Sequence, residues 1–357
     1  MRTFFFCFLL TCFVYQSNAK DTPVTKKTKN IIIMIGDGMG IAQTYASYTA
    51  NNSFLNMFLF PFTGISLTSS SDNYITDSAA GGTAMSCGKK TNNGALGKDS
   101  IGRNLKNIFE IAKENKLSTG FVVTCAVTHA TPAAFYAHNT DRNQYDSLAV
   151  DFLSGSVDVA IGGGKKYFAD RKDNRNLINE LKAKGYKFSE NIDSINCSTD
   201  CQVICLPVAK DMPKMSAGRG DYLPNAVSKA IEILSKNKEG YILMVEGSQI
   251  DWGCHKNAIN YVTSEVIDFD KSVGIAYEYA KKDSNTLVIV TADHETGGLA
   301  LTGSYLKKSE NKPSFSTLDH TAVPVMVYAY GPGADKFSGV YQNTALFFKM
   351  MEALGLK

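Results

Sequence analysis

Long runs of apolar residues recur along the chain, and stretches with a helical spacing of apolar positions lie between them. The run at residues 30–35 is continuous and rich in β-branched side chains, as expected of a strand buried on both faces. Similar runs occupy residues 120–124, 157–161, 241–245, 286–291 and 323–329. Helical patterns occupy residues 105–115, 226–235, 264–281 and 344–354. This alternation predicts an α/β fold with a large, mostly parallel β-sheet sandwiched between helices.

The domain organisation follows from the same pattern. No internal repeat or low-complexity tract interrupts the alternation of strands and helices. The polar, irregular stretch at residues 187–213 is interpreted as a surface excursion and not as a domain boundary. We therefore expect a single domain at residues 20–357, after a signal peptide at residues 1–19.

The N-terminal residues have the layout of an export signal. A positive start at Met1 and Arg2 precedes a largely apolar run at residues 3–15, and residues 17–19 offer a small-residue cleavage site. The apolar run is too short to span a membrane, and no second segment is long and apolar enough to do so. This predicts a periplasmic or secreted protein. Residues 9–12 offer the alternative of a lipid anchor on Cys12, although Thr11 fits a lipidation box poorly.

Composition and charge narrow the classes of partner. The chain has 357 residues, of which 44% are hydrophobic and 20% charged, which is ordinary for a globular protein. Its formal net charge is +3, and no long basic run is interleaved with aromatic residues. These features argue against a specific nucleic-acid-binding function.

Eight cysteines are present, and six of them lie after residue 19. Cys197, Cys201 and Cys205 are spaced four apart in a polar stretch. Without a fourth ligand nearby they make a poor zinc site. In an exported chain, a disulfide within this cluster is the better interpretation, and its pairing stays open.

Three of the predicted strands end directly in side chains that bind metals. Asp37 follows the first strand, Glu246 follows the run at 241–245, and Asp293 and His294 follow the run at 286–291. In open parallel sheets, ligands bind beyond the carboxyl ends of strands, so these side chains should converge. Each has a plain alternative, since Asp37 between glycines could simply form a turn. Such an alternative does not readily explain why all four side chains directly follow a predicted strand.

Further candidate ligands lie close by in the sequence. Asp251 and His255 are four residues apart, which places both on one face of a helix. His320 follows Asp319 just before the last apolar run. Carboxylate and imidazole groups together suit zinc, whereas carboxylate and hydroxyl oxygens suit magnesium.

A candidate nucleophile lies in the segment at residues 76–85. The small residues from Ser78 onward can start a helix, with Ser78 in its first turn. Unpaired backbone N–H groups and the helix dipole favour negative charge there, which suits a serine that must carry a phosphoryl group. A serine at this place is otherwise an ordinary helix cap.

Six motifs together resemble one family. They are Ile-Gly-Asp-Gly at 35–38, Thr-Asp-Ser-Ala-Ala-Gly at 76–81, His-Ala-Thr-Pro-Ala-Ala at 129–134, Glu-Gly-Ser-Gln-Ile-Asp at 246–251, Thr-Ala-Asp-His-Glu-Thr-Gly-Gly at 291–298 and Asp-His-Thr at 319–321. In this order they resemble the bacterial alkaline phosphatases, in particular the compact forms of cold-adapted marine bacteria. The resemblance covers essentially the whole chain after residue 19. It implies hydrolysis of small phosphate monoesters through a phosphoserine, with release of inorganic phosphate, two Zn²⁺ and one Mg²⁺ per chain, and a homodimer.

The resemblance also implies a role for each site residue. Ser78 resembles the nucleophile, and Arg142 resembles the arginine that grips two phosphate oxygens. The three implied cation sites are one zinc at Asp251, His255 and His320, a second zinc at Asp37, Asp293, His294 and Ser78, and a magnesium at Asp37, Thr131 and Glu246.

Two positions depart from the best-known enterobacterial pattern. His129 stands where that pattern has aspartate, and Trp252 stands where it has lysine. Both are candidates for tuning the third cation site, against the alternative that they only pack there. Two other functions stay open, a phosphodiesterase of the same superfamily and a non-catalytic metal-binding surface protein. Arg142 favours monoesters, and no implied ligand is missing.

Overall fold

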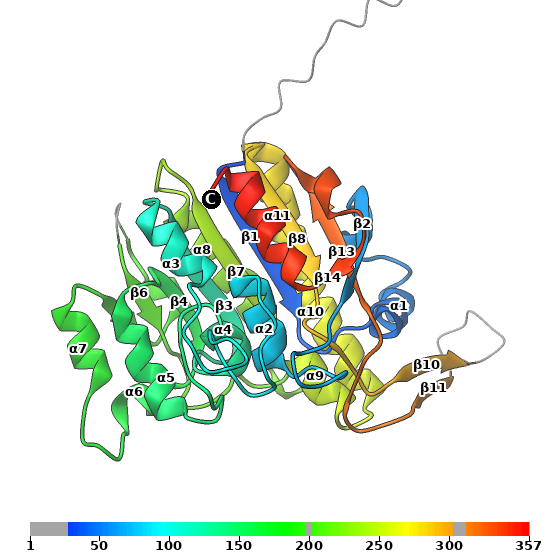
Figure 1. The fold of residues 1–357 in the computed structure, drawn as a ribbon, viewed down its shortest axis with the longest axis horizontal. Helices are drawn as coiled ribbons and strands as arrows, with labels where there is room; N and C mark the ends of the chain where they lie inside the picture. The colour runs from blue at the N-terminus through cyan, green and yellow to red at the C-terminus, as the bar shows by residue number, and fades with distance from the viewer. Residues whose placement is uncertain (1–27, 198–200, 303–311, 357) are drawn as a thin grey trace, which may run out of the picture.

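The computed structural model describes residues 28–197, 201–302 and 312–356, and a ten-stranded sheet forms its centre (Figure 1). The strands lie in the order β14 (Gly339–Gln342), β2 (Phe62–Leu67), β13 (Val325–Tyr330), β8 (Thr286–Thr291), β1 (Asn30–Gly36), β7 (Tyr241–Gly247), β3 (Ser118–Ala126), β4 (Val159–Gly163), β6 (Val203–Cys205) and β5 (Lys187–Ser189). Two small antiparallel sheets accompany it, one of β10 (Leu299–Thr302) with β11 (Lys312–Phe315) and one of β9 (Glu295–Thr296) with β12 (His320–Thr321).

The centre of the large sheet is parallel. In β1, Ile33 pairs with Met244 of β7 on one side and with Ile289 of β8 on the other. Only β13 runs antiparallel to its neighbours, β2 and β8. The prediction of a large, mostly parallel sheet is confirmed.

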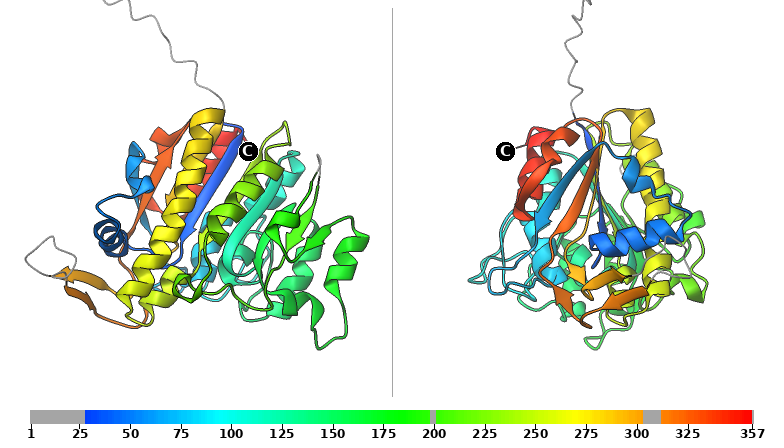
Figure 2. Two further views of the ribbon diagram at one scale, coloured as in Figure 1. Left: turned by 180° about the vertical axis from the view of Figure 1, so that it is seen from behind. Right: turned by 90° about the vertical axis from the view of Figure 1, so that its right-hand side faces the viewer.

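Helices cover both faces of the sheet (Figure 2). One face carries α2 (Ser78–Cys87), α3 (Ile108–Glu114), α4 (Ala130–Ala133), α5 (Tyr145–Asp151), α6 (Lys165–Ala169), α7 (Leu177–Ala183) and α11 (Thr344–Leu354). The other carries α1 (Ile41–Ala50), α8 (Tyr222–Leu234), α9 (Gln249–Cys254) and α10 (Ile259–Asp283). Short 3₁₀ turns are η1 (Asn56–Leu59), η2 (Phe152–Ser154), η3 (Ile192–Ser194), η4 (Met215–Ala217) and η5 (Ala334–Phe337).

Two hydrophobic cores result from the alternation of side chains along the central strands. Ile31, Ile33 and Ile35 of β1 join the core beneath α2, α3 and α11, whereas Ile32 and Met34 join the core beneath α8 and α10. Successive strand residues point to opposite faces. A strand covered on both faces must therefore be apolar at every position, and this is why the run at 30–35 is continuous.

The segment at residues 187–213 departs from the prediction. It adds β6 and β5 to one edge of the sheet, with β6 parallel to β4 and β5 parallel to β6. The interpretation as a surface excursion is wrong for these residues. Each strand has only three residues, too few to show a period; β6 forms by pairing with β4, and β5 by pairing with β6.

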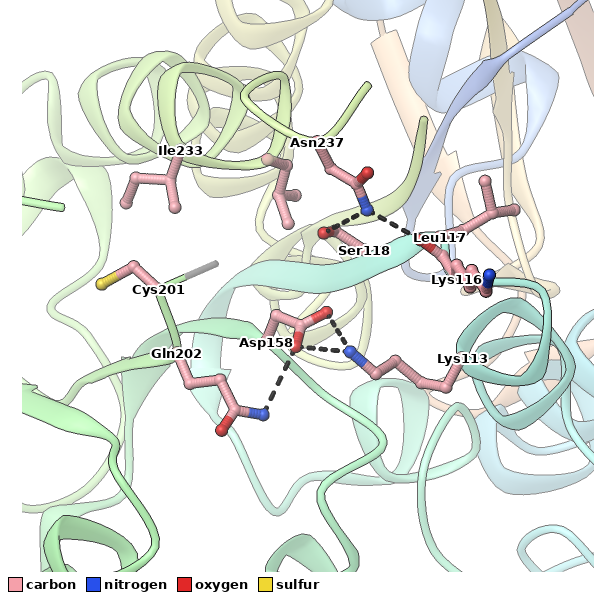
Figure 3. Close-up of a pocket in the computed structure, with 10 residues that line it drawn as sticks. Lys113, Lys116, Leu117, Ser118, Asp158, Cys201, Gln202, Ile233 and Asn237 are labelled. Carbon is pink, nitrogen blue, oxygen red and sulfur yellow. Dashed lines mark hydrogen bonds and ion pairs between the residues drawn. The ribbon is translucent and has the colours of Figure 1, made fainter. Parts of the chain in front are cut away.

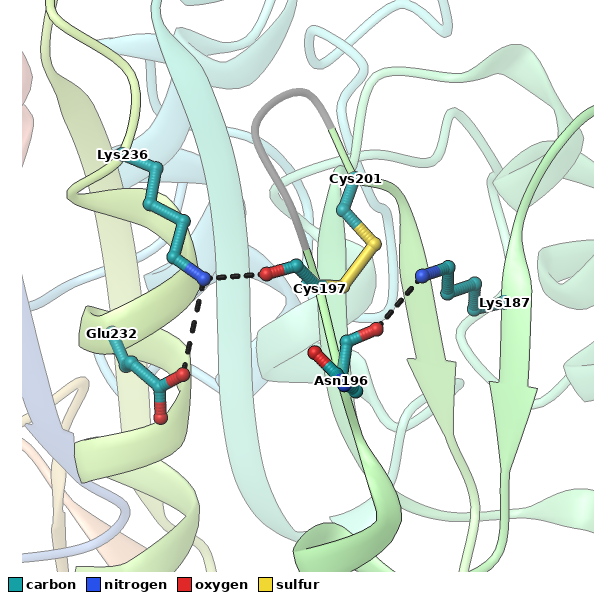
Figure 4. The surroundings of a disulfide bond; sticks show 6 residues. All are labelled: Lys187, Asn196, Cys197, Cys201, Glu232 and Lys236. Atoms are coloured by element: carbon teal, nitrogen blue, oxygen red, sulfur yellow. Dashed lines mark hydrogen bonds and ion pairs between the residues drawn. A yellow bond between two sulfur atoms is a disulfide. The ribbon is translucent and has the colours of Figure 1, made fainter.

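The predicted disulfide within the cysteine cluster joins Cys197 to Cys201 in the loop before β6 (Figure 4). Two lysine side chains donate hydrogen bonds to backbone carbonyl groups of this loop. Lys236 donates to the Cys197 carbonyl at 2.5 Å, and Lys187 donates to the Asn196 carbonyl at 2.7 Å. The third member of the cluster, Cys205, is a free buried thiol in β6.

The prediction of an export signal lies outside the described residues. The proposed signal peptide at residues 1–19 belongs to the part that the structure does not describe. Among the described residues, no helix combines the length and apolar character needed to cross a membrane.

Candidate metal centre

Three strands deliver acidic side chains to one edge of the sheet. Asp37 follows the end of β1, Glu246 lies near the end of β7, and Asp293 follows β8 by two residues. All three are buried. Because β1, β7 and β8 are neighbouring parallel strands, their carboxyl ends meet at the same edge. The structure thus brings together the side chains that the sequence placed at strand ends.

A glycine makes this convergence possible. Gly38 has φ +68°, in the left-handed region that favours glycine, and its N–H donates to the Asp293 carboxylate at 3.2 Å. A Cβ at Gly38 would lie 2.7 Å from the Thr296 hydroxyl and 2.9 Å from an Asp251 carboxylate oxygen. The backbone after β1 therefore packs directly against the site.

The first group of candidate ligands contains Asp37, Asp293 and His294. The His294 Nε2 atom lies 3.4 Å from an Asp37 oxygen and 3.2 Å from an Asp293 oxygen. The same nitrogen lies 3.3 Å from the Ser78 hydroxyl. The candidate nucleophile therefore adjoins a group of buried oxygen and nitrogen atoms that could hold a metal ion.

A second group forms around Asp251. Asp251 lies in α9 and His255 follows the end of that helix, so their spacing of four places them on one side. One Asp251 oxygen lies 3.2 Å from His255 Nε2, and the other lies 3.5 Å from His320 Nε2. The His320 ring also stacks on the His294 ring, with centroids 3.6 Å apart. The two groups are thus contiguous.

A third group lies where β3 and β7 end. It contains Glu246, His129 and Cys125, and one potential ligand atom of each lies within 4.8 Å of the others. The Thr131 hydroxyl, predicted as a ligand of the third cation, is buried nearby in α4 and has no hydrogen-bond partner among the described residues. The Trp252 ring meets the His129 ring edge-on, with centroids 6.1 Å apart. The two positions that depart from the enterobacterial pattern therefore lie side by side.

The electrostatics of these groups fit bound cations. Both Asp37 oxygens, one Asp293 oxygen and one Glu246 oxygen are buried and accept no hydrogen bond within the described ranges. Burial, followed by the charge of three neighbouring carboxylates, raises the pKa of Asp37 well above its ordinary value. Burial likewise raises the pKa of Glu246 to about 7 and that of Asp293 to about 6. Divalent cations would compensate this buried negative charge and satisfy the unpaired oxygens.

Of these imidazoles, His294 is in the neutral form that binds a metal ion, whereas His255 must first give up a proton. Burial lowers the pKa of His294 well below its ordinary value, so the ring is neutral and can offer a lone pair. The hydrogen bond to Asp251 raises the pKa of His255 to about 9. Burial alone would raise the pKa of Asp251, but the His255 hydrogen bond and the positive charge of nearby histidines hold it below its ordinary value.

Asp77 connects the nucleophile helix to the candidate phosphate-binding arginine. One Asp77 oxygen accepts from the Ala80 N–H and caps α2, so Ser78 begins the helix as predicted. The other oxygen accepts from Arg142 at 2.9 Å and from the Gly94 N–H at 3.0 Å. This arrangement holds the guanidinium beside the N-terminus of α2.

Three residues at this site escaped the sequence analysis. Asp77 was seen only as the neighbour of Ser78, and Cys125 only as one of the six cysteines after residue 19. Thr296 donates to an Asp251 oxygen at 2.6 Å and lies 3.1 Å from His294 Nδ1. Cys125 lies at the end of a strand, the same signal that identified Asp37 and Glu246. Thr296 carried no such signal, because its partner Asp251 is 45 residues away.

A polar pocket of about 270 Å³ lies at the other end of the strands, away from the candidate metal groups (Figure 3). There Lys113 forms an ion pair with Asp158 at 2.7 Å, and the Asn237 amide donates to the Ser118 hydroxyl. Ser118 begins β3 and Asp158 precedes β4, so the pocket lies at the amino ends of strands whose carboxyl ends approach the metal groups. It is separate from the candidate centre.

Comparison with known proteins identifies the family. The family model for alkaline phosphatase matches residues 28–314. The chain belongs to the alkaline phosphatase family. Alkaline phosphatase 4 of Bacillus subtilis is 36% identical over 91% of this chain and 89% of its own length. Alkaline phosphatase of Escherichia coli is 33% identical over 95% and 88% of the two chains. The family membership makes the chain an enzyme that hydrolyses phosphate monoesters.

Solved structures agree with this assignment. Alkaline phosphatase from the Antarctic bacterium TAB5 superposes with a TM-score of 0.88 and 39% identity, covering 93% of this chain and 99% of that chain. In a variant of the Antarctic enzyme that has aspartate in place of one histidine, magnesium is bound in a site called M3. The cold-active alkaline phosphatase of a Shewanella species matches with a TM-score of 0.84 and 30% identity, covering 91% of this chain and 99% of that chain. The resemblance to cold-adapted alkaline phosphatases is therefore confirmed.

Proposed function

We propose that this alkaline phosphatase forms a phosphoserine at Ser78 during hydrolysis of small phosphate monoesters. The observation that carries the proposal is the position of the Ser78 hydroxyl, at the start of α2 and 3.3 Å from His294 Nε2 within the Asp37–Asp293–His294 group. The N-terminal backbone N–H groups and the dipole of α2 favour negative charge on the phosphorylated serine. Arg142, held by Asp77, would bind phosphate oxygens.

Three cations complete the proposal. Asp251, His255 and His320 would hold one zinc, and Asp37, Asp293, His294 and Ser78 would hold a second. Asp37, Thr131 and Glu246 would provide oxygen ligands for a third cation, a magnesium. When bound, the cations lower the pKa of a coordinated hydroxyl and stabilise charge on the transferring phosphoryl group. Buried, unpaired oxygens of Asp37 and Asp293 support the second zinc site, and those of Asp37, Glu246 and Thr131 support the magnesium site.

The test combines substrate choice with trapping of the intermediate. We expect rapid hydrolysis of p-nitrophenyl phosphate and much slower hydrolysis of bis-p-nitrophenyl phosphate. Acid quench with labelled substrate should leave phosphate on Ser78, and Ser78→Ala should lower kcat by several orders of magnitude. Ser86→Ala is the matched control, since Ser86 is another buried serine of α2 and donates to the Ala134 carbonyl instead.

Three outcomes would redirect or contradict the proposal. Preference for the diester would favour the phosphodiesterase alternative. Absence of hydrolysis with all cations bound would favour a non-catalytic metal-binding protein. Label on a residue other than Ser78 would contradict the proposed nucleophile.

We also propose a homodimer. Exposed apolar side chains gather around α1 and η1, namely Ile41, Tyr45, Phe54, Phe58 and Leu59. Tyr48 links them, since its ring contacts Tyr45 at 6.0 Å and Phe58 at 5.3 Å between centroids. A contiguous apolar patch of this kind fits an interface between two copies. Sedimentation equilibrium should give twice the chain mass, and Phe58→Lys should shift it toward the monomer.

Export to the periplasm or medium is part of the same proposal. It is supported by the signal-like residues 1–19 and by the disulfide between Cys197 and Cys201, which suits an oxidising compartment. N-terminal sequencing of the mature protein should begin close to residue 20. A lipid-modified Cys12 would instead support the anchored alternative.

A further inference from the structure

The group around Asp251 lies on an open side of the candidate metal centre. The side chain of His255 is 35% exposed and that of His320 is 17% exposed, whereas His294 in the neighbouring group is fully buried. The rings of the two exposed histidines lie with their centroids 5.1 Å apart. An alcohol released at this group can therefore leave the centre past these two rings.

Both exposed histidines are held by backbone carbonyl groups. The Nδ1 atom of His320 donates to the Thr76 carbonyl at 2.9 Å, and the Nδ1 atom of His255 donates to the Leu318 carbonyl. These bonds leave the Nε2 atom of each ring beside Asp251. The two chain segments that contain Thr76 and Leu318 therefore border the group.

Both bordering segments carry exposed apolar side chains. Leu318 is 58% exposed, Ile75 is 38% exposed, and Tyr74 is 78% exposed. Single exposed apolar side chains are common on protein surfaces, so exposure alone carries no conclusion. Here they lie on both segments that bond to the histidines of one group, and apolar side chains around convergent polar groups are typical of ligand sites. We call Tyr74, Ile75 and Leu318 the apolar rim.

Hydrogen bonds fix the backbone of the rim. The Asn93 amide donates to the Ile75 carbonyl at 2.9 Å, and its oxygen accepts from the Asp77 N–H at 3.0 Å. In the other segment, the Asp319 carbonyl accepts from the Gly297 N–H at 2.9 Å. The rim is thus formed before a substrate binds, and binding needs little ordering of the backbone.

In-line displacement determines where the alcohol of a substrate lies. The Ser78 hydroxyl lies 3.3 Å from His294 Nε2, and the His294 ring stacks on His320 of the neighbouring group, with centroids 3.6 Å apart. As a bond forms between the Ser78 oxygen and phosphorus, the bond from phosphorus to the alcohol oxygen on the opposite side breaks. The leaving oxygen then faces the group with the exposed histidines, and the alcohol takes up a proton from water.

We propose that the apolar rim selects phosphate monoesters whose alcohol carries an apolar chain or an aromatic ring. The inference rests on the proposed function and deepens it, since it assigns the alcohol of the substrate to the side opposite Ser78. The rim side chains and the alcohol both lose contact with water when they meet. This burial is favourable in proportion to the apolar area, whereas a small or polar alcohol gains little from it.

Two alkyl monoesters test the inference. Hexyl phosphate and ethyl phosphate release primary alcohols of similar acidity, so the two esters differ mainly in the length of the apolar chain. The measured quantity is the ratio of kcat/KM for hexyl phosphate to that for ethyl phosphate in the same protein, so a general loss of activity cancels. We expect a ratio of about ten in the wild type, well below the value for full burial of the longer chain because the rim is open.

Variants of the rim should lower this ratio. We expect Leu318→Ser, Ile75→Thr and Tyr74→Ser to lower it about twofold each, and the triple variant to bring it close to one. Val340→Ser is the matched control, because Val340 is also exposed but lies on β14, which β2 and β13 separate from β8. It should keep the wild-type ratio. A wild-type ratio close to one, or a high ratio that survives in the triple variant, would overturn the inference.

Binding is measured separately from turnover. Hexylphosphonate and ethylphosphonate have no ester bond to break, and we expect the hexyl compound to inhibit at about tenfold lower concentration in the wild type but not in the triple variant. Sedimentation of Leu318→Ser is measured alongside, because a second copy of the chain is the other possible occupant of the rim. A fall in mass with an unchanged substrate ratio would overturn the inference in favour of an interface.

The outcomes separate this inference from the proposed function. Trapping of labelled phosphate on Ser78 is measured on the same preparations. A protein that forms phosphoserine at Ser78 but hydrolyses both alkyl esters equally well overturns only the inference about the rim. A protein that prefers hexyl phosphate but carries no label on Ser78 supports the rim and contradicts the proposed nucleophile.

Discussion

At the residue scale, one hydroxyl connects two candidate zinc sites. Thr296 has a single hydroxyl proton, which it donates to Asp251 at 2.6 Å. Its contact with His294 Nδ1 at 3.1 Å must therefore be a bond that the ring donates. This fixes the proton on Nδ1 and leaves the Nε2 lone pair facing Ser78 and the Asp37–Asp293 carboxylates.

We predict that Thr296→Val weakens zinc binding about tenfold or more, because outer partners of metal-binding histidines typically contribute 10–100-fold. Valine keeps the shape but removes the hydroxyl. Zinc competition against a chromophoric chelator gives the affinity, and ¹⁵N NMR of the histidine rings reports the tautomer. Thr296→Ser should restore most of the affinity.

Thr44→Val is the control for that measurement. Thr44 is also buried, but its hydroxyl donates to the Gly40 carbonyl within its own helix region. Its zinc affinity should match that of the wild type. Equal zinc affinity and an unchanged His294 spectrum in Thr296→Val would show that the hydroxyl does not position the ring.

At the element scale, the run of small residues in α2 is explained by what the helix packs against. A Cβ at Gly81 would lie 3.1 Å from both the Cβ and the carbonyl oxygen of Asp293. A Cβ at Gly82 would lie 2.9 Å from that of Ala134. The glycines thus let the nucleophile helix approach the end of β8 and the α4 region closely, at the cost of intrinsic helix propensity.

The turn between β1 and α1 depends on the glycine at position 38. Gly38→Ala places a side chain at positive φ, which costs about 1–3 kcal/mol, and forces it against Thr296 and Asp251. We expect lower unfolding free energy together with weaker zinc binding and lower turnover. Denaturant unfolding and metal analysis after dialysis measure the two effects.

Gly102→Ala is the control for Gly38→Ala, because it introduces the same backbone strain without a steric clash. Gly102 has φ +84°, but its added Cβ would meet no atom within 4 Å. It should cost only the backbone strain of about 1–3 kcal/mol and leave zinc content unchanged. If Gly38→Ala retained full zinc content, the turn would not be needed to shape the site.

At the scale of the whole molecule, the fold concentrates uncompensated carboxylates at one sheet edge between two apolar layers. Such a centre should destabilise the metal-free protein in a pH-dependent way. The pKa of Asp37 is raised well above its ordinary value and that of Glu246 to about 7, both first of all by burial. The folded state therefore holds protons that the unfolded chain has already released, and stability falls as pH rises.

We expect this fall in the stability of the metal-free protein to be measurable between about pH 6.5 and 8. Below about 6.5 the buried histidines, whose pKa values burial lowers, oppose the effect because they protonate mainly in the unfolded chain. Above that value these rings are neutral in both states, whereas His255, whose pKa the Asp251 hydrogen bond raises to about 9, keeps its proton in the folded state and adds to the fall in stability as pH rises. Burial lowers the pKa of Lys90 to about 8, which adds an opposing slope at higher pH.

We therefore predict that Tm of the chelator-treated protein falls from pH 6.5 to 8, and that the Tm gain on adding zinc grows over the same range. Zinc would replace the proton that Asp37 holds, so its contribution increases as proton competition fades. Differential scanning calorimetry with and without zinc measures both trends. A zinc-induced gain that stays constant with pH would contradict this linkage.

The sequence by itself determined the class of fold and the chemistry at the ends of its strands. A strand covered on both faces needs apolar residues at every position, so β1 was visible as a continuous run, and the abrupt change to Asp37 was visible with it. Motif order was sufficient to predict the family. The structure brings the predicted ligands together, and their roles as ligands stay predictions.

Only the tertiary structure decided which side chains act as partners across the sheet. The short strand β6 pairs with the free side of β4, β5 pairs in turn with β6, and β13 runs antiparallel to both of its neighbours, β2 and β8. Thr296 meets Asp251, and Cys125 meets Glu246, over long separations in the sequence. Such contacts leave no local period or spacing in the sequence. They depend on the order of the strands in the sheet, which differs from the order of the strands along the chain.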